Sequence, residues 1–124
     1  MMKVIALKIW KKQDKLMRVL VEAGLYSSLS ECLRTATWDF LKKVYTNNPD
    51  LKTIFENNAE FEEQFTGATV SITAKFPISM ITIIDLVVRQ HKTRFKNRSD
   101  FFRVALIDFL IMDSQLFFPY LTEA

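Results

Sequence analysis

The sequence predicts a mainly helical protein with two short β-strands, in which a strand–helix–turn–helix unit occurs twice. Only 2 glycines and 3 prolines occur in 124 residues, too few for the tight turns of an all-β sandwich. Residues 30–41 and 99–110 share an order of Ser, acid, two apolar residues and Arg, followed by Ala, acid, Phe and Leu at equal offsets. A short run that alternates with period two precedes each repeat, as is typical of strands.

The first unit begins with the alternating run of residues 5–9, which predicts a strand with one buried face. A helix is expected over residues 12–23, because apolar side chains recur there at helical spacing. Ser28 or Ser30 is expected to cap a second helix that ends near Val44.

The second unit repeats this order. Its strand is expected over residues 72–76, and Pro77 suits the first turn of the following helix, where no backbone N–H is needed. Asn97 or Ser99 is expected to cap the last helix, which ends near Met112. The apolar face expected for the helix after Pro77 consists of Met80, Ile81, Ile84, Leu86, Val87 and Val88.

Four segments organise the chain. An acidic stretch with helically spaced apolar residues joins the two units, and a tail rich in large apolar residues follows the second. The tail is expected to pack onto the body or onto a partner. The predicted boundaries are 1–46 for the first unit, 47–68 for the connector, 69–113 for the second unit and 114–124 for the tail.

Charge is distributed unevenly along the chain, although the net charge is only +3. Residues 1–44 contain nine basic residues (Lys or Arg) and four acidic ones, whereas residues 45–69 contain one basic residue and five acidic ones. Residues 70–124 are again basic, with seven basic residues and five acidic ones. This alternation indicates one surface that faces a polyanion and another that is kept away from it.

Several classes of function are excluded by composition. One Cys and one His cannot form a zinc site by themselves, and a single Cys cannot form an internal disulfide. No set of nucleophile, His and acid is visible, so we expect neither an enzyme nor a cofactor. The longest apolar stretch, residues 78–88, is shorter than the roughly 18 residues of a membrane span, and the start lacks a secretory signal. We therefore expect a cytoplasmic protein.

The duplicated unit resembles the ribbon-helix-helix family of DNA-binding proteins, the MetJ/Arc-like group. The resemblance depends on residues 5–9 and 72–77 as strands and on residues 24–34 and 95–103 as turns into the second helices. It implies a mainly α fold with a two-stranded antiparallel β-ribbon, formed as a tandem ribbon-helix-helix pseudo-dimer within one chain. A self-paired monomer and a homodimer of tandem chains both fit.

The resemblance also implies a site, because the ribbon of this family enters the major groove of duplex DNA. If the apolar residues of both strands face inward, the side chains left to contact bases are Val4, Ala6, Lys8, Ser71, Thr73 and Lys75. Lys, Thr and Ser can bond base edges, whereas Ala and Val can only touch a thymine methyl. We therefore expect asymmetric recognition, with more readout by Thr73 and Lys75 than by Ala6.

Phosphate contacts are implied at the starts of helices, where free N–H groups favour anions. The expected contacts are Lys11, Lys12, Ser28, Leu29, Ser30, Lys96, Asn97, Arg98 and Ser99. The implied role is transcriptional regulation by repression, at the nucleoid. The alternatives are an antitoxin or plasmid-type accessory protein, or an interaction scaffold that binds a protein partner through the connector or tail.

Other residues have structural interpretations. Lys8 and Lys75 are alternatively exposed strand lysines that block edge pairing. Arg34 and Arg103 recur in the repeat and are expected to be solvated or paired with nearby acids. Cys32 is expected in the core and His91 in a loop without a metal. The aromatic side chains expected in the core are Trp38, Phe40, Phe101, Phe102 and Phe109, while Trp10 packs under the ribbon or lies beside the DNA backbone.

Overall fold

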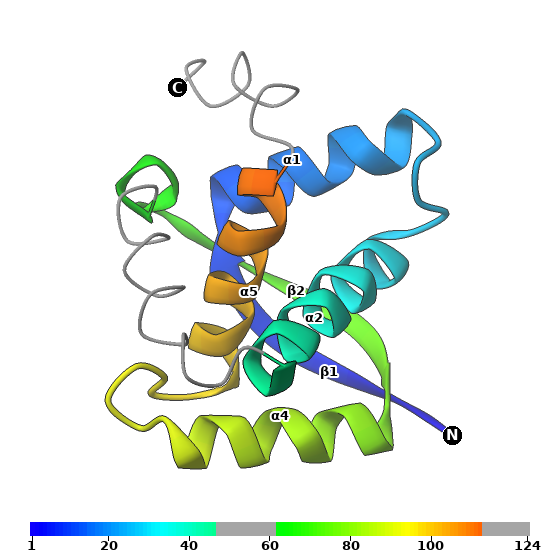
Figure 1. The fold of residues 1–124 in the computed structure, drawn as a ribbon. Helices are drawn as coiled ribbons and strands as arrows, with labels where there is room; N and C mark the ends of the chain where they lie inside the picture. Colours follow the sequence, from blue (N-terminus) through cyan, green and yellow to red (C-terminus); the bar gives the residue numbers. More distant parts are fainter. Residues whose placement is uncertain (47–61, 113–124) are drawn as a thin grey trace.

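The structure is a computed structural model and describes residues 1–46 and 62–112. Most of the predicted connector and the whole predicted tail lie outside the described residues. The elements, in chain order, are β1 (Met2–Trp10), α1 (Lys11–Glu22), α2 (Leu29–Thr46), β2 (Thr69–Pro77), α4 (Ile78–Gln90) and α5 (Arg98–Met112) (Figure 1). Residues 62–65 are also helical.

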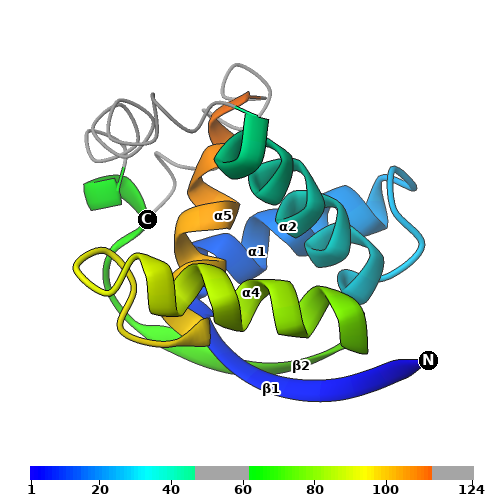
Figure 2. The ribbon, with the colours of Figure 1, turned by 60° about the horizontal axis from the view of Figure 1, so that its bottom comes forward.

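The two strands form an antiparallel ribbon, although they are far apart in the chain. Met2 lies opposite Pro77, Trp10 lies opposite Thr69, and Ala6 lies opposite Thr73 at the centre. The labelled helices all lie on one side of this ribbon, and none of them covers its other face (Figure 2). The prediction of a mostly helical fold with a two-stranded antiparallel sheet is confirmed.

The alternation of the strands separates a buried face from an exposed one, as predicted. Ile5, Leu7 and Ile9 of β1 are at most 6% exposed, and Phe76 of β2 is fully buried. Ile72 is only half-buried but packs against the same core. Because side chains alternate along a strand, burial of this set places every second residue of the ribbon on its outer face.

The core is formed where α2 and α5 pack against each other and against the ribbon. α2 packs on β2 and α5 packs on β1, so each central helix covers the strand of the other unit. A chain of aromatic rings joins them: Phe76 lies 5.2 Å from Phe102, which lies 5.7 Å from Phe101, and Phe101 lies 5.5 Å from Phe40. These contacts tie both helices and β2 into one core.

Three expectations about side chains and boundaries are wrong. Pro77 ends β2 and precedes the first residue of α4, because its extended backbone still pairs with Met2. Trp38 is 49% exposed and Leu86 is 41% exposed, although both were expected to be buried. Helical spacing identifies a continuous apolar face but not how much of it a neighbour covers. Trp38 borders an open hollow of about 210 Å³ between α2 and α4, together with Tyr45.

Candidate nucleic-acid interface

The outer face of the ribbon carries the six side chains predicted to contact bases. All six are exposed, and they face one another across the strands as Val4 with Lys75, Ala6 with Thr73 and Lys8 with Ser71. The two lysines therefore lie diagonally on either side of the central pair. Within the described part of the chain, none of these side chains makes a hydrogen bond or an ion pair.

The chemistry of this face is uneven between the strands. β2 presents two hydroxyls and an ammonium group through Ser71, Thr73 and Lys75, whereas β1 presents one ammonium group beside Val4 and Ala6. Hydroxyl and ammonium groups bond acceptors on base edges, but Val and Ala have only methyl groups to offer. The outer face thus has more hydrogen-bonding capacity on β2.

Each outer edge of the ribbon is held by a side-chain bracket from the central helix that covers it. On β1, the backbone N–H of Lys8 donates to Ser99 Oγ at 2.9 Å, and Arg103 Nη1 donates to the carbonyl of Lys8 at 2.9 Å. Edge groups of a two-stranded ribbon have no strand partner, so they need such bonds or water. This bracket fixes the backbone from which the Lys8 side chain extends.

The same bracket occurs on β2, at the positions that the sequence repeat equates. The N–H of Lys75 donates to Ser30 Oγ at 3.1 Å, and Arg34 Nη1 donates to the carbonyl of Lys75 at 2.8 Å. Sequence reasoning missed this role of the two arginines, which were expected only to be solvated or ion-paired. Their recurrence at equal offsets was the available signal.

Helix capping is assigned to residues other than Ser30 and Ser99. Ser28 Oγ accepts from the N–H of Glu31 at 3.1 Å, and Asn97 Oδ1 accepts from the N–H of Asp100 at 2.9 Å. The carboxylates in turn accept from the N–H of the residue before each cap, at 2.8 Å for Glu31 and 3.0 Å for Asp100. These reciprocal bonds form a variant of the capping box at the start of α2 and of α5, in which the carboxylate binds the N–H of the residue before the cap and not that of the cap itself.

The hydrogen bonds of the first capping box also affect the Glu31 carboxyl. The side chain and then the backbone N–H of Ser27 donate to it, which lowers its pKa below the usual value. A carboxylate at the first turn of α2 also faces the positive end of the helix dipole. Glu31 is therefore a fixed negative charge beside Ser28, Leu29 and Ser30, three of the predicted phosphate contacts.

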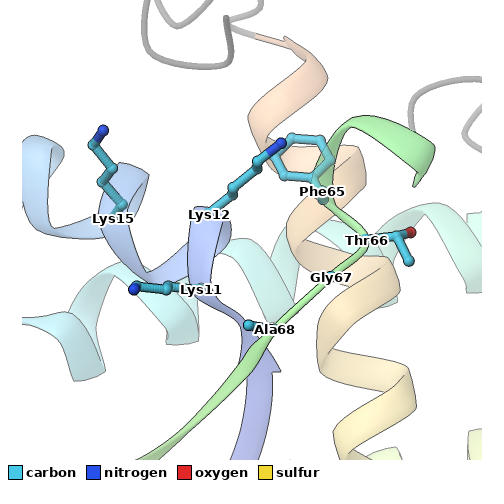
Figure 3. A pocket seen from close by; sticks show the side chains of 7 residues that line it. All are labelled: Lys11, Lys12, Lys15, Phe65, Thr66, Gly67 and Ala68. Atoms are coloured by element: carbon cyan, nitrogen blue, oxygen red, sulfur yellow. The ribbon is translucent and has the colours of Figure 1, made fainter. Parts of the chain in front are cut away.

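The predicted phosphate contacts on α1 border a hollow of about 360 Å³ (Figure 3). Lys11, Lys12 and Lys15 project from the first turns of α1, and the backbone before β2 forms the opposite wall. The remaining lining residues are Phe65, Thr66, Gly67 and Ala68. Lys15 was not predicted from the sequence, although its spacing from Lys11 and Lys12 places it on the same side of a helix.

At the start of α5, Lys96 is exposed and Arg98 is partly buried. The guanidinium of Arg98 makes a two-pronged ion pair with Asp85 of α4, at 2.6 and 2.7 Å. This pair lowers the pKa of Asp85 and raises that of Arg98, in each case first through the side-chain hydrogen bond. Of the predicted phosphate contacts, Arg98 therefore has part of its charge already neutralised.

Trp10 lies at the junction of β1 and α1, partly buried, with the Arg103 guanidinium 5.8 Å from its ring centre. It packs against the core. The backbone N–H of Trp10 donates to Gln13 Oε1 at 3.2 Å, and the buried Gln13 amide donates to the carbonyl of Arg103 at 2.8 Å. These bonds connect the end of the ribbon to α5.

Cys32 and His91 lie away from the outer face. Cys32 is fully buried, and burial raises the pKa of its thiol to about 12. His91 directly follows α4 as its C-cap, and its backbone N–H donates to the carbonyl of Val87 at 3.0 Å. Within residues 1–46 and 62–112, His, Cys, Asp and Glu side chains nowhere gather in a group of three that could hold a metal ion.

No protein-family model, curated protein or solved structure matches the chain. None of the helices in the described residues combines the length and apolar character that crossing a membrane requires.

Proposed function

We propose that the chain binds duplex DNA with the outer face of the β1–β2 ribbon in the major groove, and that it regulates transcription by occluding a promoter. The observation that carries this proposal is the outer face itself. It presents the side chains of Lys8, Lys75, Thr73 and Ser71 to solvent, without a hydrogen bond or ion pair to any described residue, on a backbone that α2 and α5 hold in place. A two-stranded ribbon fits the width of the major groove.

Recurring contacts support a tandem ribbon-helix-helix arrangement in which one chain supplies both units. The brackets on Lys8 and Lys75, the capping boxes of α2 and α5 and the crossed packing of central helices on strands all occur twice. They occur at positions related by the sequence repeat. Two units that pair their strands in this way form a pseudo-dimer.

The proposal is tested by fluorescence anisotropy on short duplex DNA at two salt concentrations. We expect Lys8→Ala/Lys75→Ala to bind on the order of tenfold more weakly than the unaltered chain, equal to about 1.4 kcal/mol. Binding should weaken steeply with salt, because each phosphate that a cation neutralises releases counterions.

The matched control for the single variants Lys8→Ala and Lys75→Ala is Lys42→Ala, which likewise removes one exposed positive charge. Lys42 lies near the end of α2 that is remote from the ribbon (Figure 2). The single variants Lys8→Ala and Lys75→Ala should each weaken binding more than Lys42→Ala does. Equal effects of all three would contradict a groove contact by the ribbon, and absence of binding at low salt would contradict DNA binding altogether.

The alternative function is an antitoxin, plasmid-type accessory protein or scaffold that binds a protein partner through the connector or tail. The segments that would carry this function, the connector up to residue 61 and the tail, lie outside the described residues. The outer face of the ribbon lies within them, and its exposed lysines and hydroxyls favour DNA as the first ligand to test. A protein contact through apolar side chains would lack the steep salt dependence expected for phosphate.

A further inference from the structure

The end of the ribbon at Trp10 and Thr69 is where α1 and α5 begin. The N–H of Lys11, the first residue of α1, donates to the carbonyl of Ala68 at 2.8 Å. The first turn of α5 is joined to the same end, since Ser99 accepts from Lys8. We call this region, with the starts of both helices, the basic end.

The opposite end of the ribbon, at Met2 and Pro77, is where α4 and α2 begin. The N–H of Ile78, the first residue of α4, donates to the carbonyl of Met1 at 3.2 Å, which repeats the contact of Lys11. The first turn of α2 is joined there through Ser30 and Lys75. We call this region the neutral end.

The sequence repeat relates five cations at the basic end to five uncharged residues at the neutral end. When the two halves are aligned with the shift of 67 residues that relates their strands, Lys11, Lys12 and Lys15 correspond to Ile78, Ser79 and Thr82. With the shift of 69 residues that relates α2 to α5, Lys96 and Arg98 correspond to Ser27 and Leu29. In the described part of the chain, Arg98 alone among these five cations forms an ion pair.

Nearby charges do not remove this difference. At the basic end, Asp14 is paired with Arg18 at 2.9 Å, Asp100 with Arg103 at 3.6 Å and Glu62 with Arg94 at 3.5 Å. Among side chains, the neutral end has one cation without an equivalent at the basic end, Lys3 of β1. Among the described residues, the basic end thus has four lysines without ion pairs and the neutral end has one, while Lys8 and Lys75 balance each other.

We propose that the protein engages DNA with a fixed polarity: the unlike side chains of β1 and β2 orient the ribbon on an asymmetric base sequence, and the basic end then holds backbone phosphates mainly on one flank. This inference depends on the proposed DNA binding and adds which flank of the site is anchored. Lys11, Lys12, Lys15 and Lys96 anchor the phosphates on one flank of the groove, whereas the neutral end contributes little beyond Lys3. Binding in the reverse orientation would keep the phosphate contacts but would place the side chains of β1 and β2 on the wrong halves of the base sequence.

The orientation can be measured by cleavage from a tethered reagent. Cys32 is the only cysteine and is buried, so a new surface cysteine is the only reactive thiol. Thr69 and Met2 are both exposed and are equivalent positions at the two ends. An iron chelate attached to Thr69→Cys or to Met2→Cys would cleave a duplex selected from a randomised library, and phosphate-ethylation interference would be mapped on the same duplex.

A fixed polarity predicts one cleaved flank for each variant, on opposite sides of the selected sequence. Ethylation should block binding mainly on the flank that Thr69→Cys cleaves. Interference of equal strength on both flanks, or cleavage of both flanks by each variant, would overturn the polarity and leave DNA binding intact. Failure of the unaltered chain to select or bind any duplex would overturn the proposed function and, with it, this inference.

Salt dependence provides a second measurement on the same DNA. Lys12→Gln/Lys96→Gln should lower the slope of log affinity against log salt by about 0.9 per lost phosphate contact. Lys42→Gln, which removes an exposed charge remote from the ribbon, should leave the slope unchanged. Ser79→Lys, which places a cation at the neutral position equivalent to Lys12, should raise the slope. A double variant with the slope of Lys42→Gln would contradict anchoring at the basic end.

Discussion

Residues of the same type take different roles within a few positions of each other at the start of α2. Ser28 caps the helix, whereas Ser30 binds the backbone of Lys75 on a strand 45 residues away. The residue type predicts a hydroxyl near a helix start, but it cannot identify a distant partner. For this reason the sequence offered two candidate caps for each helix, whereas the recurring Ser and Arg marked the bracket residues without identifying their partners on the strands.

Removal of a bracket hydroxyl should destabilise the fold. Ser30→Ala and Ser99→Ala should each lower the free energy of unfolding by about 0.5–1.5 kcal/mol, the usual net contribution of one hydrogen bond. The control is Ser79→Ala, an exposed serine on α4. Urea unfolding measures all three, and a bracket variant as stable as the control would show that water replaces the serine without cost.

The thiol of Cys32 should not react with alkylating reagents in the folded protein. Burial raises the pKa of its thiol from 9.0 to about 12, so almost no thiolate exists near neutral pH. Alkylation should therefore require unfolding. Above pH 9 the thiol of the unfolded chain ionises first, so this group lowers the stability as the pH rises toward about 12. Labelling of the folded chain at the rate of a free thiol would contradict this burial.

At the scale of elements, local patterns predicted the strands and helices well. Period-two alternation gave the buried and exposed faces of β1 and β2, because one face of a ribbon packs on helices. The alternation could not show that the strands extend to Trp10 and Pro77, where pairing rather than local preference maintains the extended backbone. Exposure of Trp38 could not be predicted either, because it depends on the open hollow that remains between α2 and α4.

The contact between α4 and α5 should depend on pH. The hydrogen bonds from Arg98 hold the pKa of Asp85 below its usual 3.8, so the pair stabilises the fold above that pH and loses its effect as the pH falls further. Asp85→Asn should lower the free energy of unfolding at neutral pH by less than about 1 kcal/mol, because both side chains are about two-fifths exposed. Thermal unfolding across the acid range measures this, and the two proteins should converge at low pH.

At the scale of the whole molecule, the ribbon joins both halves of the chain. β1 precedes α1 and α2 but is covered by α5, and β2 precedes α4 and α5 but is covered by α2. Neither half can therefore keep its core without the other. The repeat was visible in the sequence, and the strand pairing was expected from the family resemblance; the crossed packing of α2 and α5 required the three-dimensional structure.

This arrangement predicts that the folded unit is one chain. Because both strands of the ribbon come from the same polypeptide, the unfolding midpoint should not change with protein concentration. Thermal unfolding over a wide range of concentrations checks this, with sedimentation as an independent measure of mass. A midpoint that rises with concentration would indicate that a second copy contributes to stability, as in a homodimer of tandem chains.

The pairing of Ala6 with Thr73 at the centre of the ribbon has a consequence for how its outer face can evolve. In a symmetric homodimer, one codon specifies both residues of such a central pair, so every substitution appears twice. Here separate codons specify the two strands, and a single mutation changes one side of the ribbon only. Each half of the outer face can therefore diverge without altering the other, and Ala6 and Thr73 already differ.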